Sequence, residues 1–252
     1  MSADGSRRVS GMVLSSMPVG ETDKRIVLLT REEGLISAFV RGGRRQGSSM
    51  LASSTPFAFG VFDVYIGRSS VTVHSASIDN YFTEIREDID LVWYGTYFLE
   101  IAEYYGLEGA DETERLNLLY VTLSALGKGI MDPDLIRWIY ELRTWAVGGE
   151  YPNVYSCTGC GREEELSFFS PAAGGSICRE CHDSGVDADP ISDSCLYAIR
   201  YIIATPLNRL YSFKLTEEVR VELIDLLKRW KNRYVSHRFK SEEFLKFAGK
   251  GE

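Results

Sequence analysis

Two pairs of cysteines constrain the fold of this chain more than any other feature of its sequence. The first pair lies in CTGCG and the second in CREC, with residues 161–177 between them. A CxxC turn can present two thiolates to one metal ion, and two such turns at this spacing are typical of a zinc site. We therefore predict a structural Zn2+ site whose ligands are Cys157, Cys160, Cys178 and Cys181.

Other uses of the same four thiols stay open. An iron–sulfur cluster also takes four thiolates, whereas a redox dithiol normally occurs as a single CxxC motif. Two pairs around a short hairpin favour zinc, and a metal closed by four cysteines leaves no position for a substrate. We expect the remaining cysteine, Cys195, to be buried in a helix, and His182 to be solvent-exposed rather than a ligand.

The first eighty residues have the pattern of a small β-barrel. Five β-branched or alternating stretches follow one another with short connections: RRVSGMVLSSMPV, KRIVLLT, LISAFVRG, FAFGVFDVYIG and SVTVHSASI. Closing these strands into a barrel leaves no exposed sheet edge. We predict an OB-type barrel over residues 1–80, with an SH3-like barrel as the alternative, and a longer basic loop over residues 42–56.

Residues 81–252 have the periodicity of a helical domain. The spacing of apolar residues and the capping signals predict helices over 90–105, from Asp111 to Gly127–Gly129, from Asp132 to Gly148–Gly149, over 192–204 and 216–236, and near 242–247. The predicted fold class is α+β. An OB-type barrel precedes an all-α helical domain, and the zinc-binding segment 155–183 is inserted between helices.

Positive charge is concentrated in two places, although the formal net charge of the chain is −8. Arg41, Arg44 and Arg45 lie in a glycine-rich loop, where the backbone can approach a phosphate and guanidinium groups can bind its oxygens. A solvated loop is the simpler interpretation. The second concentration is a possible second anion or partner site, or a stabilised helix C-terminus: Lys228, Arg229, Lys231, Arg233, Arg238 and Lys240.

Several function classes lack support in the sequence. There is no GxxxxGK[ST], GxSxG or HExxH motif, and the three histidines lie in no recognisable triad, so we expect no enzyme activity. No apolar run has the length of a membrane span, and the N-terminus lacks the apolar core of a secretory signal. We expect a cytoplasmic protein without a membrane partner.

Residues 21–49, ETDKRIVLLTREEGLISAFVRGGRRQGSS, resemble the N-terminal barrel of the RecO family of bacterial recombination mediators. CTGCG followed by FFSPAAGGSICREC is similar to the central region of that family. The family pattern is matched by these residues: Glu21, Asp23, Leu29, Thr30, Gly34, Arg41, Gly42, Arg44 and Ser48. The resemblance covers the barrel, the helices and the cysteine pairs in the order of the family.

The resemblance implies a DNA repair and recombination mediator associated with the bacterial nucleoid. Such a protein binds single- and double-stranded DNA and anneals complementary strands. With RecR it helps to load RecA onto DNA coated with single-stranded DNA-binding protein, whose acidic C-terminal tail it contacts. The alternative is a zinc-containing protein-interaction adaptor that does not bind nucleic acid.

A DNA-binding face on the barrel is consistent with this role. The candidate residues are Lys24, Arg25, Arg41, Arg44 and Arg45, which lie on one face if the strands pair as expected. Phe39 and Tyr65 are candidate stacking platforms for bases. For both aromatic residues, however, an inward-facing position in the barrel core is the favoured interpretation.

Overall fold

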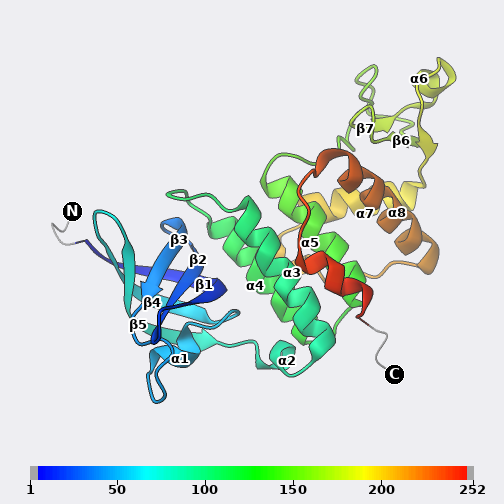
Figure 1. Ribbon diagram of the computed structural model, residues 1–252. Coiled ribbons are helices and arrows are strands. Elements are labelled where there is room, and N and C mark those ends of the chain that lie inside the picture. The colour runs from blue at the N-terminus through cyan, green and yellow to red at the C-terminus, as the bar shows by residue number, and fades with distance from the viewer. Residues whose placement is uncertain (1–4, 249–252) are drawn as a thin grey trace. The chain divides into compact units, whose positions relative to one another are not determined.

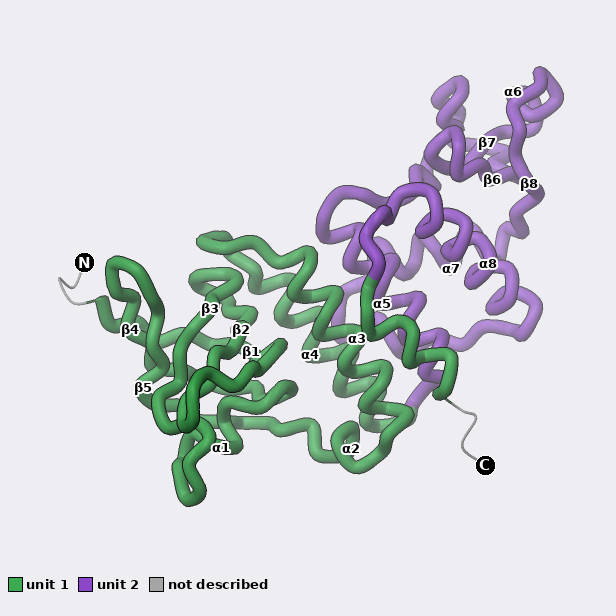
Figure 2. The backbone as a smooth tube through the Cα atoms, viewed as in Figure 1, with its two compact units in different colours: residues 1–129, 239–252 green, residues 130–238 purple. Residues whose placement is uncertain are grey.

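A computed structural model describes residues 5–248 of the chain. These residues form two compact units (Figure 2). Unit 1 comprises Met1–Gly129 and Phe239–Glu252, and unit 2 comprises Ile130–Arg238. The predicted domain boundary after residue 80 concerns independent folding and stays a prediction. Among the helices of residues 5–248, none combines the length and the apolar character that crossing a bilayer requires.

Unit 1 begins with a closed five-stranded barrel in the order β1-β2-β3-β5-β4 (Figure 1). The strands are β1 (Ser6–Val19), β2 (Asp23–Thr30), β3 (Gly34–Val40), β4 (Phe59–Ile66) and β5 (Val71–Asn80). Only β3 and β5 pair in parallel, through Ala38↔Val71, Phe39↔Thr72 and Val40↔Val73. A short helix, α1 (Met50–Ser53), lies in the connection between β3 and β4. The prediction of an OB-type barrel is confirmed.

Alternation along the strands fills the interior of the barrel. Successive side chains of a strand point to opposite faces, so every second residue enters the core. Ile26 and Leu28 of β2 are fully buried, as are Ala38 and Val40 of β3. Phe62 of β4 is the largest side chain of this core. The residues between these positions face outward and form the outer surface of the barrel.

Besides α1, the helices of unit 1 are α2 (Thr83–Arg86), α3 (Ile89–Tyr105), α4 (Thr113–Gly127) and the 3-10 helix η2 (Ser241–Lys246). Asp88 caps α3, because its carboxylate accepts hydrogen bonds from the N–H groups of Asp90 and Leu91. The predicted cap of α4 at Asp111 is wrong by one residue. Glu112 occupies the N-cap, while Asp111 accepts a hydrogen bond from the Thr113 N–H at 2.9 Å.

Unit 2 packs three longer helices, α5 (Pro133–Val147), α7 (Asp193–Ala204) and α8 (Glu217–Tyr234). Asp132 caps α5 through its side chain, as predicted, and the side chains of Ser192 and Thr216, where helices were expected to begin, cap α7 and α8. A small sheet of order β7-β6-β8 lies between α5 and α7 in the sequence. Its region contains β6 (Phe168–Ser170), β7 (Gly175–Ile177), α6 (Arg179–Asp183) and β8 (Asp189–Pro190), and the 3-10 helix η1 (Leu207–Arg209) follows α7.

Candidate metal centre and nucleic-acid interface

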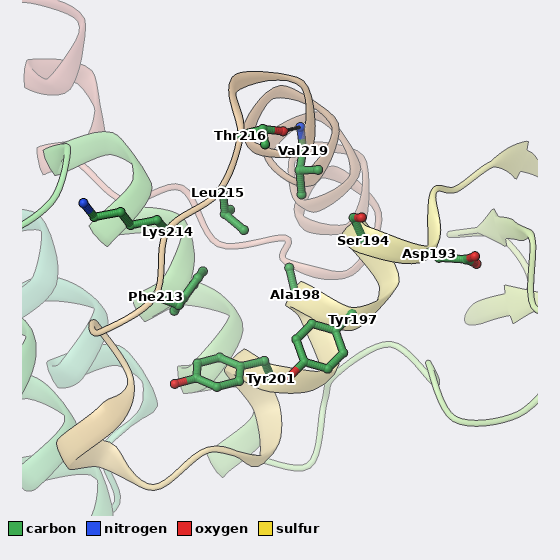
Figure 3. A pocket seen from close by; sticks show the side chains of 10 residues that line it. All are labelled: Asp193, Ser194, Tyr197, Ala198, Tyr201, Phe213, Lys214, Leu215, Thr216 and Val219. Carbon is green, nitrogen blue, oxygen red and sulfur yellow. Dashed lines mark hydrogen bonds between the residues drawn. The ribbon is translucent and has the colours of Figure 1, made fainter.

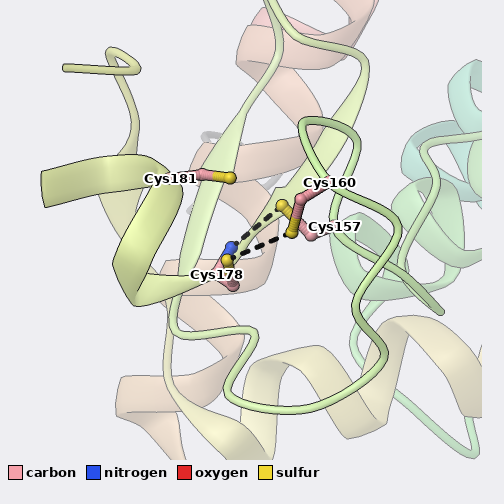
Figure 4. Close-up of side chains that lie close together, drawn as sticks. All are labelled: Cys157, Cys160, Cys178 and Cys181. Carbon is pink, nitrogen blue, oxygen red and sulfur yellow. Dashed lines mark hydrogen bonds between the residues drawn. The ribbon is translucent and has the colours of Figure 1, made fainter. Parts of the chain in front are cut away.

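The four predicted cysteine ligands converge on one point (Figure 4). Their Sγ atoms all lie within 4.8 Å of one another, and the Sγ atoms of Cys160 and Cys178 are 3.7 Å apart. A tetrahedral zinc ion with Zn–S bonds of about 2.3 Å places its sulfur ligands about 3.8 Å apart. Both the donor set and its spacing therefore fit a four-thiolate metal ion.

The backbone around Cys157 prepares its sulfur to carry negative charge. Gly161, with φ of 79°, closes the first turn by donating its N–H to the Cys157 carbonyl at 2.8 Å. The Cys178 N–H points at the Cys157 Sγ at 3.3 Å. Burial raises the pKa of the Cys157 thiol, but the N–H groups of Cys178, Cys160 and Gly159 outweigh burial and lower this pKa to about 6.

The Cys181 sulfur resists ionisation in the absence of a cation. Hydrogen bonds with Cys160, Cys157 and Cys178 raise the pKa of the Cys181 thiol to about 12. A dication at the centre removes this penalty, because it interacts favourably with all four thiolates at once. The site is thus chemically suited to a divalent metal that binds soft sulfur ligands.

His182 and Cys195, which lie near the cysteine pairs in the sequence, do not belong to the ligand group. His182 is outside the ligand group, and its ring stacks on Phe168 at a centroid distance of 3.8 Å with 5° between the planes. It is partly exposed rather than fully solvated. Cys195 is fully buried in α7, and burial raises the pKa of its thiol to about 12. The expectation of a buried Cys195 is confirmed.

The arginine loop, residues 41–49, is fastened to the turn between β1 and β2. The Asp23 carboxylate accepts the Gly42 N–H at 2.8 Å, and Gly42 has a positive φ of 64°. The Arg44 N–H donates to the Thr22 carbonyl at 2.9 Å, and the Arg44 Nη1 donates to the Gly20 carbonyl at the same distance. These bonds fix the backbone of the loop, whereas Arg41, Arg44 and Arg45 stay exposed.

The carboxylates of the chain leave the three loop arginines uncovered. Within residues 5–248, no carboxylate oxygen lies within 4.0 Å of a charged nitrogen of Arg41, Arg44 or Arg45. Asp23 is the acidic residue whose pKa responds to them. Hydrogen bonds from Gly42 and Thr22 lower the pKa of Asp23 below its usual value, and the charges of Arg45 and Arg41 lower it further.

Lys24 and Arg25 point to opposite sides of β2. The Lys24 Nζ donates to the Leu51 carbonyl and to the Ser54 Oγ, both at 3.1 Å. Burial, followed by the nearby charge of Arg44, lowers the pKa of Lys24. The Arg25 Nε instead donates to the Ser37 Oγ at 2.7 Å on the outer face. The structure therefore brings Lys24 next to the arginine loop and separates Arg25 from it.

Phe39 and Tyr65 lie on the outer face of the barrel, so the favoured interpretation of both as core residues is wrong. Their exposed fractions are 39% and 42%. The strand register pairs Arg25 with Phe39, Phe39 with Thr72, and Thr72 with Tyr65, which forms an outer row across β2, β3, β5 and β4. Strict alternation with the buried Ala38, Val40 and Val64 was the sequence signal for this orientation.

The second basic concentration does not form a single surface. Lys231 is buried, with its Nζ 3.1 Å from the Glu141 carboxylate and 5.8 Å from the centroid of the Trp138 ring. Its assignment to a surface anion site is therefore wrong. Arg229 forms ion pairs with Asp189 and, at 3.1 Å, with Asp225. Lys228, Arg233 and Arg238 are exposed in unit 2, whereas Lys240 belongs to unit 1.

Unit 2 also contains an apolar pocket of about 620 Å³ beside α7 (Figure 3). Tyr197, Ala198 and Tyr201 of α7 face Phe213, Leu215 and Val219 across it. Lys214 supplies the one positive charge among the lining residues. Sequence reasoning did not identify this pocket, because its two sides come from segments that only tertiary packing brings together.

The fold and the site define a protein in which an OB-type barrel with an arginine loop is followed by a helical domain that contains a four-cysteine group able to hold a metal ion. Two family models match the chain in this order. "Recombination protein O N terminal" matches residues 4–82, and "Recombination protein O C terminal" matches residues 86–243. The chain belongs to the RecO family of DNA repair proteins.

Curated relatives agree with the family models over most of the chain. The DNA repair protein RecO of Alkaliphilus metalliredigens is 31% identical over 226 residues, which cover 88% of this chain and 91% of the relative. The RecO protein of Symbiobacterium thermophilum is 30% identical, with 94% of this chain and 95% of the relative covered. The RecO protein of Bacillus subtilis is 29% identical, with coverages of 94% and 93%.

Proposed function

We propose that the chain binds single- and double-stranded DNA and anneals complementary strands. Together with RecR, it helps to load RecA onto DNA coated with single-stranded DNA-binding protein. It acts by binding rather than by breaking bonds, and it works on nucleoid DNA in the bacterial cytoplasm. One observation carries the proposal: three exposed arginines on a fastened loop of an OB-type barrel, with no carboxylate of residues 5–248 in ion-pair contact.

The arrangement of charges and rings supports binding that does not depend on base sequence. Guanidinium groups form charge-assisted hydrogen bonds with phosphate oxygens, which every nucleotide carries. Phe39 and Tyr65 offer ring faces on which any base can stack, and Arg25 lies beside Phe39 in the outer row. Annealing requires such contacts, because two strands must be held while their bases stay free to pair.

The test is a salt titration of the complete protein with labelled single-stranded DNA. Changing Arg41, Arg44 and Arg45 together to alanine should weaken binding and reduce the magnitude of the slope of log K against log salt by about 2, at roughly 0.7 per lost phosphate contact. Fluorescence anisotropy measures both quantities. A matched control removes three exposed cations elsewhere, Lys128, Arg179 and Lys246, and should leave the slope near its original value.

An unchanged affinity and slope in the loop variant would contradict the proposal. That outcome would favour the alternative function, a zinc-containing adaptor that binds only proteins. The net charge of −8 and the apolar pocket beside α7 are the features that such an adaptor would use. A pull-down of RecR with and without excess oligonucleotide separates the two functions, because the adaptor would show no competition.

For the acidic tail of single-stranded DNA-binding protein, we propose the apolar pocket of Figure 3. Tyr197 and Phe213 would pack against apolar side chains of the tail, and Lys214 would attract its carboxylates. Tyr197→Ala and Lys214→Glu should each weaken binding of a labelled tail peptide, while Tyr155→Ala, at another exposed tyrosine of unit 2, should not. Equal binding by all variants would exclude this pocket.

Lys228, Arg233 and Arg238 of unit 2 remain a proposed second anion site for DNA, and Lys240 of unit 1 is proposed separately as a phosphate contact. Their exposure supports it, and the buried Lys231 and the doubly paired Arg229 are left out. Changing Lys228, Arg233 and Arg238 together to alanine should reduce affinity less than the loop variant does. No change in affinity for either single- or double-stranded DNA would restrict DNA binding to the barrel.

A further inference from the structure

A second pocket of unit 2 is walled by aromatic rings and has a volume of about 410 Å³. Its lining residues are Trp145, Glu150, Tyr151, Gly174, Trp230, Tyr234 and Val235. We propose that this aromatic pocket binds the cationic side chain of an arginine or lysine from a protein partner. The proposal concerns a different ligand class from the phosphate groups at the barrel, and it does not depend on DNA binding.

The end of α5 builds one wall of the aromatic pocket. The helix ends at Val147, and Gly149 then takes a positive φ of 75° that reverses the chain. This reversal lets the Glu150 N–H donate to the Trp145 carbonyl at 2.8 Å. Glu150 and Tyr151 are thereby returned toward Trp145, and all three residues line the aromatic pocket.

The last turn of α8 builds the opposite wall. The rings of Trp230 and Tyr234 lie 4.1 Å apart between their centroids. The Tyr234 hydroxyl donates to the Pro171 carbonyl at 2.7 Å, which fixes the orientation of its ring. Tyr234 and Tyr151 are partly exposed, whereas Trp145 and Trp230 are 3% and 4% exposed and form the interior of the pocket.

The electrostatics of the aromatic pocket favour a cation. Glu150 carries the only formal charge among the lining residues, and aromatic ring faces attract cations. Both α5 and α8 present their C-terminal ends here, where the helix dipole is negative. The Arg233 guanidinium lies 6.0 Å from the Tyr234 centroid, so a ring of this wall already accepts a cation, although this charge, which lies outside the lining residues, opposes a second one. A phosphate or carboxylate ligand would be repelled by Glu150 and by the C-terminal ends of the two helices.

The test uses the indole N–H signals of the complete, 15N-labelled protein as reporters. Four tryptophans are present, and two of them, Trp145 and Trp230, line the aromatic pocket. N-acetylarginine amide is the probe, and N-acetylcitrulline amide is its neutral isostere. We expect the arginine probe to shift the signals of Trp145 and Trp230 at millimolar concentrations, while Trp93 stays in place. The citrulline probe should bind about fivefold more weakly, the factor that corresponds to roughly 1 kcal/mol of cation–π attraction.

Two substitutions at exposed rim positions avoid damage to the buried tryptophans. Glu150→Gln and Tyr151→Leu should each weaken the arginine probe about threefold to fivefold. Tyr155→Leu, at a comparably exposed ring outside the aromatic pocket (43% against 37% for Tyr151), should bind the probe like the original protein. Equal shifts by both probes, no shift at tens of millimolar, or unchanged binding by both rim variants would overturn the proposal. A variant without the three loop arginines should still respond, so failure of the DNA-binding proposal would not affect this result.

Discussion

Single side chains decide whether charge in this protein is structural or available to a ligand. Glu141 of α5 is 2% exposed and lies 2.9 Å from the Arg137 Nε and 3.1 Å from the Lys231 Nζ. Each of these charges is tolerated in the interior because the others compensate it. The exposed arginines of the barrel loop have no carboxylate of residues 5–248 in ion-pair contact, and this difference separates the two basic regions of the sequence.

Removing the negative charge of this buried group should destabilise unit 2 strongly. Glu141→Gln removes the carboxylate that pairs with both Arg137 and Lys231, and we expect it to lower the free energy of unfolding by about 3–5 kcal/mol. Lys231→Met should cost less, because Arg137 still pairs with Glu141. Urea denaturation measures both changes. Lys228→Met, at an exposed position, is the control and should change the free energy of unfolding by less than about 0.5 kcal/mol. If Glu141→Gln causes an equally small change, the buried charges do not stabilise unit 2 as expected.

Asp23 anchors the arginine loop through a hydrogen bond and also places a negative charge beside it, and substitutions can remove these two properties separately. Its pKa is lowered chiefly by the Gly42 N–H, so its contribution to stability is present above the ordinary aspartate pKa of about 3.9 and is lost only as acid takes the pH through the lower folded value. At neutral pH the carboxylate is fully charged. Asp23→Asn should therefore keep an acceptor for Gly42 while removing a charge that repels phosphate.

We expect two substitutions of Asp23 to change the affinity for DNA in opposite directions. Asp23→Asn should bind single-stranded DNA as well as or more tightly than the original protein, with the gain disappearing at high salt. Asp23→Ala loses this hydrogen bond and should bind more weakly, because the loop keeps only the two anchoring bonds of Arg44. Anisotropy titrations at two salt concentrations distinguish the effects. Identical affinities for the two variants would show that the anchor has no role.

At the scale of elements, the sequence was most informative where structure depends on near neighbours. The caps at Asp132, Ser192 and Thr216 were predictable because each acts within three residues of itself. The four metal ligands were predictable because two tight turns position them. Lys231 also had a local signal, since it follows Leu227 by four residues and Ile224 by seven on the apolar side of α8.

Contacts between distant elements were beyond such reasoning. The pairing of Lys231 with Glu141 requires α8 to pack on α5, and the local sequence of neither helix shows that the two are neighbours. The apolar pocket beside α7 and the aromatic pocket at the ends of α5 and α8 arise in the same way. Phe39 is the opposite case, because alternation alone shows its direction once β3 is placed between buried neighbours.

The cysteine segment is the element that should depend most on its metal. Its strands β6, β7 and β8 contain only three, three and two residues, too few to be stable by themselves. Metal binding must therefore supply much of the folding free energy of this region. Removing the metal with a chelator, or changing Cys181 to Ser, should disorder residues 155–183 while the barrel stays folded.

Elemental analysis and hydrogen exchange test this expectation together. Protein purified under reducing conditions should contain about one zinc ion per chain, the stoichiometry of a four-thiolate site. Loss of zinc should increase amide exchange in residues 155–183 and leave β2 and β3 protected. Cys195→Ala is the control, because this buried cysteine lies outside the ligand group. Iron in place of zinc, or unchanged exchange in the metal-free protein, would contradict the assignment.

At the scale of the whole molecule, the chain leaves unit 1 after Gly129 and returns to it at Phe239. The returning segment packs on α3. Phe239 is 2% exposed, and its ring meets the edge of Tyr97 at 5.7 Å between centroids. The Glu100 carboxylate accepts the N–H groups of Lys240 and Ser241 at 2.9 and 2.8 Å. Unit 1 is therefore completed by residues from the end of the chain, which its strand and helix patterns alone could not reveal.

This return makes the stability of unit 1 depend on residues far from the barrel in sequence. Phe239→Ala should lower the free energy of unfolding of unit 1 by about 3–5 kcal/mol, because it leaves a cavity among buried aromatic rings. Phe247→Ala, at a ring that is 63% exposed, is the matched control and should change it by less than about 0.5 kcal/mol. Urea denaturation followed by the fluorescence of Trp93, which stacks on Phe244 at 4.7 Å, reports on this packing when the other three tryptophans are changed to phenylalanine. The prediction is contradicted if unit 1 of a chain that stops after Arg238 unfolds at the same urea concentration as in the complete protein. In that case the returning segment does not contribute to stability, and residues 1–129 suffice as the folded DNA-binding part.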